Sequence, residues 1–194
     1  MHIHQMSVTY LPEQDRILMR INTTDAEEMR LWLTRRLMMG LWPLLSRMLT
    51  DHLLKLESAG ASLQTADDEL RKMLAEFRKE EFLRSADFET PYNETRSKLP
   101  LGEEPLLITD VDATPLPNGP LRLSFNERPA NGSPRSFQME LEAKLMQGLM
   151  HLLEQSLNQS GWRDAFSPAA APAGEPSVTE DDQSTGLRKP RYLN

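Results

Sequence analysis

Cysteine is absent from the 194-residue sequence, and its absence excludes several kinds of chemistry at once. A chain without a thiol has no disulfide, no thiolate nucleophile and no cysteine-ligated zinc or iron–sulfur site. The lack of cysteine suits a reducing compartment, and no charged and apolar leader precedes the first polar alternation. From these two observations we expect a cytoplasmic protein.

Long hydrophobic runs and an excess of positive charge are also lacking. The most apolar run covers residues 37–49, follows Arg35 and Arg36 and contains Arg47, so it is too short and too close to charge to cross a membrane. With 22 basic against 29 acidic residues, the formal net charge is -7. This acidic balance makes general binding to polyanions a poor first expectation.

Common catalytic and cofactor-binding patterns are missing as well. The sequence contains no G-x-x-x-x-G-K-[ST], G-x-G-x-x-G, H-E-x-x-H or G-x-S-x-G. His2 and His4 could share one face of a strand, but no third ligand lies within reach in the sequence, so we expect no metal site. We therefore expect a protein that is not an enzyme and that uses no cofactor.

The chain does contain a long stretch that it nearly repeats. Residues 29–49, MRLWLTRRLMMGLWPLLSRML, resemble residues 137–157, FQMELEAKLMQGLMHLLEQSL, and both contain a glycine at the matching place, Gly40 and Gly148. In each copy an alternating apolar pattern gives way to helical spacing, which predicts a strand that runs directly into a helix. Two leucine-rich helices can share leucines by chance, but the matching glycines and the shared switch favour an internal duplication.

Turn signals and alternation around these stretches complete the predicted architecture. Strands are expected at residues 3–11, 16–22 and 27–34 and again at 106–111 and 121–126, before the second copy of the strand and helix. We therefore predict an α+β fold of two tandem β-β-β-α units, each an antiparallel meander plus a helix, with the helices packed together on one side of the sheets. The units cover residues 1–58 and 105–162, with a helical insertion and linker at 59–104 and a disordered tail at 163–194.

The two helices of the N-terminal half carry different expectations. The helix that begins near Arg35 has a wide apolar arc, so it should be buried on two sides, and Pro43 should kink it or delay its start. The insertion helix, expected at about residues 65–84, has one narrow apolar stripe and a charged face. It should therefore cover a surface on one side only. The members of its stripe are Leu70, Met73, Leu74 and Phe77.

The outer face of the first predicted sheet is the strongest candidate for a binding site. If the fully apolar positions of its strands face a helix, a period of two residues places a mixed cationic and apolar set on the other side. That set is Arg16, Leu18, Arg20, Arg30 and Trp32. Arginine and tryptophan dominate protein interfaces, and they also bind single-stranded nucleic acid through phosphate contacts and base stacking.

With an acidic chain, the protein interface is the favoured reading of this face. We expect an interaction protein that binds a protein partner or a second copy of itself, with single-stranded nucleic acid as the alternative. An exposed tryptophan on a sheet needs a cover, so Trp32 should contact a partner or the insertion helix.

A third hypothesis rests on the run Leu-Leu-Ile-Thr-Asp-Val-Asp-Ala-Thr at residues 106–114. An apolar strand followed by Asp-x-Asp-x-Thr resembles the first motif of haloacid dehalogenase-type phosphatases. By that resemblance Asp110 would be the nucleophile and Asp112 the general acid of a magnesium-dependent phosphohydrolase. The long alternating domain that follows the motif in that family has no counterpart here, and two solvated aspartates near a turn are the simpler reading.

Overall fold

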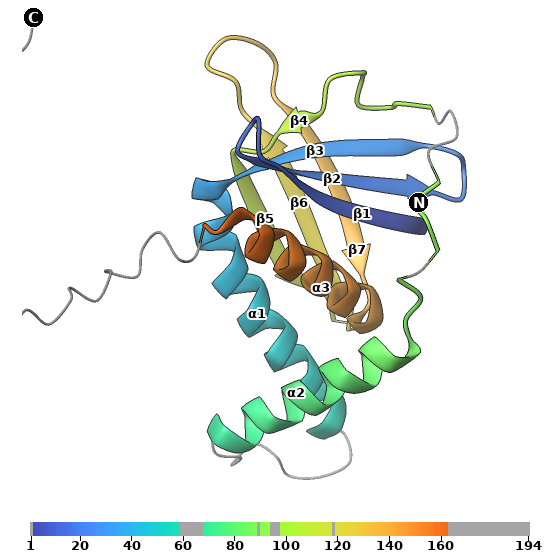
Figure 1. The fold of residues 1–194 in the computed structure, drawn as a ribbon, viewed down its shortest axis with the longest axis vertical. Helices are drawn as coiled ribbons and strands as arrows, with labels where there is room; N and C mark the ends of the chain where they lie inside the picture. The colour runs from blue at the N-terminus through green and yellow to red at the C-terminus, as the bar shows by residue number, and fades with distance from the viewer. Residues whose placement is uncertain (1, 59–67, 89, 94–97, 118, 163–194) are drawn as a thin grey trace, which may run out of the picture.

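The computed structural model describes residues 2–58, 68–88, 90–93, 98–117 and 119–162, and the predicted tail at 163–194 lies outside these ranges. Within them the chain is an α+β protein with two sheets and three helices (Figure 1). None of these helices is long and apolar enough to span a membrane. In chain order the elements are β1 (Ile3–Leu11), β2 (Arg16–Thr23), β3 (Glu28–Thr34), α1 (Arg35–Ser58), α2 (Asp68–Ser85), β4 (Leu106–Leu107), β5 (Asp110–Pro115), β6 (Leu121–Glu127), β7 (Arg135–Leu141) and α3 (Ala143–Ser160).

The first sheet has the strand order β1-β2-β3-β4, and the second has the order β5-β6-β7. Strands β1 to β3 form an antiparallel meander, and so do strands β5 to β7, as the alternating patterns predict. The alternation also predicts correctly which face of β2 is buried. Ile17, Met19 and Ile21 are at most 1% exposed, while the residues between them are partly exposed.

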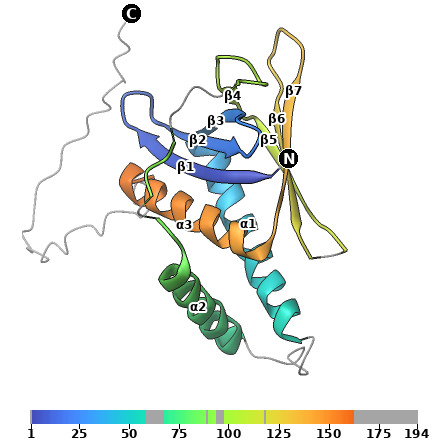
Figure 2. The same ribbon diagram turned by 90° about the vertical axis from the view of Figure 1, so that its right-hand side faces the viewer.

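Helices α1 and α3 pack against both sheets and enclose one continuous core. Figures 1 and 2 show α3 beneath β1, in the angle between the sheets, and α3 also contacts β7 and α1. The hydroxyl of Ser156 on α3 donates to the carbonyl of Val8 on β1 over 3.2 Å. Helix α1 contacts β3 of the first sheet and β5 of the second. Each of these helices therefore contacts the strand that precedes it and one strand far from it in the sequence, β5 for α1 and β1 for α3.

The apolar run at residues 106–111 does not form the single strand that its composition predicts. Leu106 and Leu107 form β4, which pairs parallel with β3, and the chain then leaves the first sheet to begin β5 at Asp110. The crossing is made by Ile108, whose N–H donates to Trp32 O, and by Thr109, whose N–H donates to Asn126 O. Leu106 and Ile108 of this run are buried whereas Thr109 is exposed, and burial alone does not specify which sheet a residue joins.

The structure of helix α1 excludes one of the two alternatives predicted for Pro43. It begins at Arg35, directly after β3 and as expected, and it contains Pro43, so the alternative of a later start is excluded. The hydroxyl of Thr34 accepts the N–H of Leu37 over 3.3 Å, which satisfies one of the free donors of the first turn. Leu44 is 43% exposed, so the apolar arc of α1 is not buried on two sides along its whole length.

Helix α2 contacts α1 and α3 rather than a sheet (Figure 2). Two members of its predicted stripe, Met73 and Phe77, do not make that contact, since they are 66% and 63% exposed, and the side chains of Leu70 and Leu74 lie outside the described part of the chain. Instead Phe82, one turn beyond the stripe, is buried at 9% exposure, and its ring approaches Gly148 of α3. The insertion helix therefore leaves the outer face of the first sheet uncovered, which removes one of the candidate covers of Trp32.

Candidate functional site

The structure brings the five predicted binding residues together on the outer face of the first sheet. Leu18 lies opposite Trp32, Arg20 lies opposite Arg30, and Arg16 lies opposite Thr34 in the register of β2 and β3. All five side chains are partly exposed. We call this surface the outer face.

The charge of Arg30 is already compensated within the chain. Its Nε forms an ion pair with Oε1 of Glu28, a carboxylate whose side chain is only 5% exposed. The hydroxyl of Tyr92 donates to the other oxygen of Glu28 over 3.2 Å. Glu28 thus holds a cation and a phenol at one end of the outer face.

Tyr92 also engages Arg20, which the sequence did not predict. The guanidinium carbon of Arg20 lies 4.5 Å from the centroid of the Tyr92 ring, a cation–π geometry. Burial, followed by the neighbouring carboxylate of Glu28, raises the pKa of the Tyr92 hydroxyl, so it stays protonated and donates. A single tyrosine in a linker without periodicity gives no sequence signal for such a contact.

Hydrogen bonds between side-chain amides of the sheet and backbone groups near Tyr92 hold this segment across the end of the sheet. The side-chain amide of Gln5 donates to Pro91 O and accepts from Asn93 N over 3.3 and 3.0 Å. The side-chain amide of Asn22 donates to Asn93 O over 2.8 Å. The chain itself therefore covers the Arg20 and Arg30 end of the outer face, and the Leu18 and Trp32 end stays partly exposed.

The aspartates of the phosphatase-like run are engaged in local contacts. Arg128 forms an ion pair with Oδ2 of Asp110 over 3.2 Å, and the side-chain amide of Asn126 donates to both Asp110 and Asp112. The hydroxyl of Thr109 donates to the same Oδ2 of Asp110 over 2.9 Å. Among the described residues, no group of three or more acidic or histidine side chains could hold a metal ion. This arrangement favours a structural role for both aspartates.

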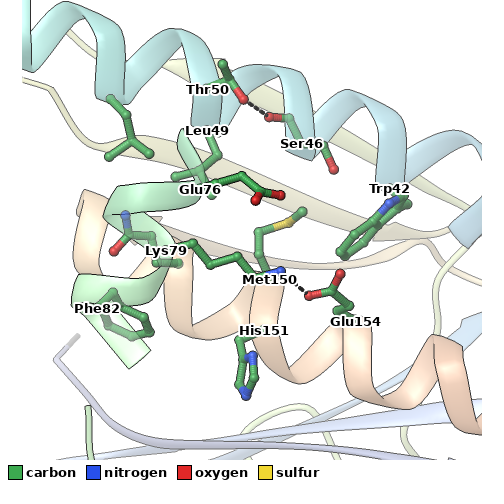
Figure 3. Close-up of a pocket in the computed structure, with 12 residues that line it drawn as sticks. Trp42, Ser46, Leu49, Thr50, Glu76, Lys79, Phe82, Met150, His151 and Glu154 are labelled. Carbon is green, nitrogen blue, oxygen red and sulfur yellow. Dashed lines mark hydrogen bonds and ion pairs between the residues drawn. The ribbon is translucent and has the colours of Figure 1, made fainter. Parts of the chain in front are cut away.

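A pocket between the three helices is a feature that sequence reasoning missed (Figure 3). It has a cavity volume of about 260 Å³ and is lined by both apolar and polar side chains of α1, α2 and α3, and most of its lining surface is apolar. Nζ of Lys79 on α2 forms an ion pair with Oε2 of Glu154 on α3 over 2.6 Å, and Figure 3 shows the lysine reaching between the helices. The site exists only because α2 packs on the other two helices, so no local sequence motif predicts it.

His151 lies at the edge of this pocket, where its ring packs 4.7 Å from the centroid of Phe88. Burial lowers the pKa of the imidazole, the carboxylate of Glu154 opposes that shift and Lys79 adds to it. The ring is therefore biased towards its neutral form. Its Nδ1 is buried and has no hydrogen-bond partner among the described residues.

No family model, curated protein or solved structure compared with the chain gives a match.

Proposed function

We propose that the chain is a non-enzymatic interaction protein that binds a protein partner, or a second copy of itself, through the outer face of its first sheet. The observation that carries this proposal is the directly opposed pair Leu18 and Trp32, which stays partly exposed while the neighbouring end of the face is covered by Tyr92. Aromatic anchors beside arginine are typical of the centre of a protein interface.

Single-stranded nucleic acid is the second candidate for the same face, since Arg16, Arg20 and Arg30 surround Trp32. Phosphate binding needs cations that are free to release counterions, whereas Arg30 is paired with Glu28 and Arg20 lies over Tyr92. Two of the three cations are thus engaged within the chain, which favours a protein over a nucleic acid. The cytoplasmic location expected from the sequence accompanies this proposal as a prediction.

The substitution Trp32→Ala tests the proposal through self-association and partner capture. We expect loss of self-association in sedimentation experiments, or loss of a partner captured from the native host in nuclease-treated extract, with the thermal midpoint nearly unchanged because Trp32 lies outside the core. Gln138→Ala, at an exposed position on β7 of the second sheet, is the matched control and should change neither property.

Two outcomes would count against the proposal. If Trp32→Ala lowers the stability of the monomer by ~3 kcal/mol or more and leaves association and capture unchanged, the tryptophan is part of the fold. If instead the wild type binds oligonucleotides in a steeply salt-dependent way, and both Trp32→Ala and Arg16→Ala abolish that binding, the nucleic-acid candidate replaces the protein partner.

We also propose that the two β-β-β-α units arose by internal duplication. Both units follow the same order of three antiparallel strands and a helix, and Leu41 and Leu149, which match in the two sequence copies, are 5% and 1% exposed. Truncation of either leucine to alanine should therefore cost a similar free energy of unfolding, ~2 to 5 kcal/mol, in urea titrations. A large cost at one leucine and almost none at the other would indicate that the two helices are not equivalent.

A further inference from the structure

We propose that the pocket between α1, α2 and α3 binds a small organic amine, with the ammonium group beside Glu76 and the apolar body between the helices. This site is separate from the outer face of the first sheet, and the inference does not depend on the proposed function. It rests on the shape of the pocket, on the kind of side chains that line it and on the position of one carboxylate.

The walls of the pocket are suited to an apolar body. Leu49 and Leu53 of α1, Met150 of α3 and Phe82 of α2 line it, together with the indole of Trp42. The cavity volume of about 260 Å³ is slightly below the range of ordinary ligand sites, so it suits a small molecule with a single ring or a short alkyl chain.

Among the described side chains that line the pocket, one carboxylate has no counterion. Its charged lining residues are Glu76, Lys79 and Glu154, and Lys79 is already paired with Glu154. Glu76 has no hydrogen bond or ion pair to any described side chain, and Figure 3 shows its carboxylate extending from α2 between α1 and α3, towards the side where Trp42 lies. The imidazole of His151, whose pKa is lowered mainly by burial, contributes little positive charge.

This distribution selects a cation over an anion or a neutral molecule. An ammonium group beside Glu76 gains a charge-assisted hydrogen bond, and the face of a tryptophan ring attracts the same charge. An anionic ligand would have to compete with Glu154 for Lys79 and would be repelled by the carboxylate of Glu76. A neutral molecule of the same shape would gain only the apolar contacts.

Isothermal titration calorimetry with three molecules of nearly identical shape tests the charge preference. The probes are 2-phenylethylamine, 2-phenylethanol and phenylacetate, titrated into the full chain at low ionic strength. We expect saturable binding of the amine at one site, binding of the alcohol weaker by about three- to tenfold, and the weakest binding for the acid. Absence of saturable amine binding, or equal binding of amine and alcohol, would overturn the proposal.

Two substitutions on α2 connect that binding to the pocket. Glu76→Gln should reduce the affinity for the amine to that of the alcohol and leave the affinity for the alcohol unchanged, because only the charge is removed. Glu69→Gln, at an exposed position of the same helix that does not line the pocket, is the matched control and should bind like the wild type. Equal losses in both variants would show a general effect of acidic charge on α2 and would also refute the site.

Discussion

Gly40 and Gly148 occupy matching places in the two sequence copies, but their surroundings differ. A methyl group added at Gly148 would meet the ring of Phe82 at 3.5 Å, which is an ordinary contact, whereas nothing lies within 4 Å of one added at Gly40. Gly148 thus faces the helix that the insertion adds, and Gly40 faces open space. Identity of residue type in a repeat does not imply identity of role.

Because Gly40 lies inside α1 without a packing role, we predict that Gly40→Ala stabilises the protein. Alanine lowers the backbone entropy lost on folding, which should raise the free energy of unfolding by ~0.5 to 1 kcal/mol in urea titrations. Gly161→Ala is an opposing control, because Gly161 ends α3 with a φ of 62°, where a side chain is strained. A destabilised Gly40→Ala variant would mean that the exposed side of α1 contacts something that excludes a methyl group.

At the scale of elements, Glu127 connects the two sheets. Its Oε1 accepts the N–H of Leu107 on β4 over 2.8 Å, and its Oε2 pairs with Nε of Arg135 on β7 over 2.5 Å. The side chain is 13% exposed, so both contacts are largely shielded from water. The hydrogen bond and charge of Arg135 and the backbone N–H of Leu107 hold the pKa of Glu127 below its ordinary value of 4.5, and burial opposes them.

A carboxyl with a lowered pKa in the folded state stabilises the fold above its unfolded pKa and loses that contribution as pH falls through the folded pKa. Glu127→Gln should therefore lower the free energy of unfolding by ~1 to 2 kcal/mol near neutral pH, and the difference from the wild type should shrink below about pH 4.5. Urea titrations between pH 3 and 7 measure this. Glu140→Gln, which removes the exposed partner of Arg122, should change stability little at any pH.

The alternating patterns of β2 and β3 predicted their faces because the period of two residues is a local property of any strand. The path at residues 106–110 was not predictable in the same way, since an apolar residue between two sheets can join either of them. The contact residues of α2 were not predicted correctly for a related reason. Met73 and Phe77 of its predicted stripe have helical spacing but are exposed, whereas Phe82 lies where α1 and α3 are within reach, and only the tertiary arrangement determines that.

The outer face shows the same division between local and long-range information. Period two placed Arg16, Leu18, Arg20, Arg30 and Trp32 on one side, and the register of the strands agrees. The contact of Tyr92 with Arg20 joins positions 72 residues apart, so no periodic pattern in the sequence predicts it. The three-helix pocket likewise depends on three separated segments, so sequence reasoning could identify the helices but not the cavity between them.

At the scale of the whole molecule, the C-terminal end of the described chain returns to its beginning. Trp162 is 2% exposed, its indole N–H donates to Oδ1 of Asp15 over 2.6 Å, and its ring makes an edge contact with Tyr10 at a centroid distance of 5.7 Å. The hydroxyl of Tyr10 donates to the same Oδ1 over 2.9 Å, and the hydrogen bonds of Trp162 and then of Tyr10 lower the pKa of Asp15. The second half of the chain is thereby attached to the turn between β1 and β2.

This attachment gives a sharp test of where the folded unit ends. A variant that ends at Asp164 should keep the thermal midpoint of the full chain, because the residues removed are rich in Pro, Ala, Ser, Glu and Asp and offer little apolar surface to bury. A variant that ends at Gly161 loses Trp162 as well, and it should unfold roughly 10 °C lower, since removal of a buried tryptophan costs ~3 to 5 kcal/mol. Differential scanning calorimetry compares the two midpoints.

The substitution Trp162→Ala in the full chain separates the loss of the side chain from the position of the new terminus. If the indole is responsible, Trp162→Ala should lower the midpoint about as much as the end at Gly161 does, and Asp15→Asn should lower it by less, because the ring contact with Tyr10 remains. If the end at Asp164 already lowers the midpoint by several degrees, residues beyond 164 contribute to the fold and the predicted disordered tail is wrong. If neither truncation matters, the buried tryptophan stabilises the fold far less than its 2% exposure implies.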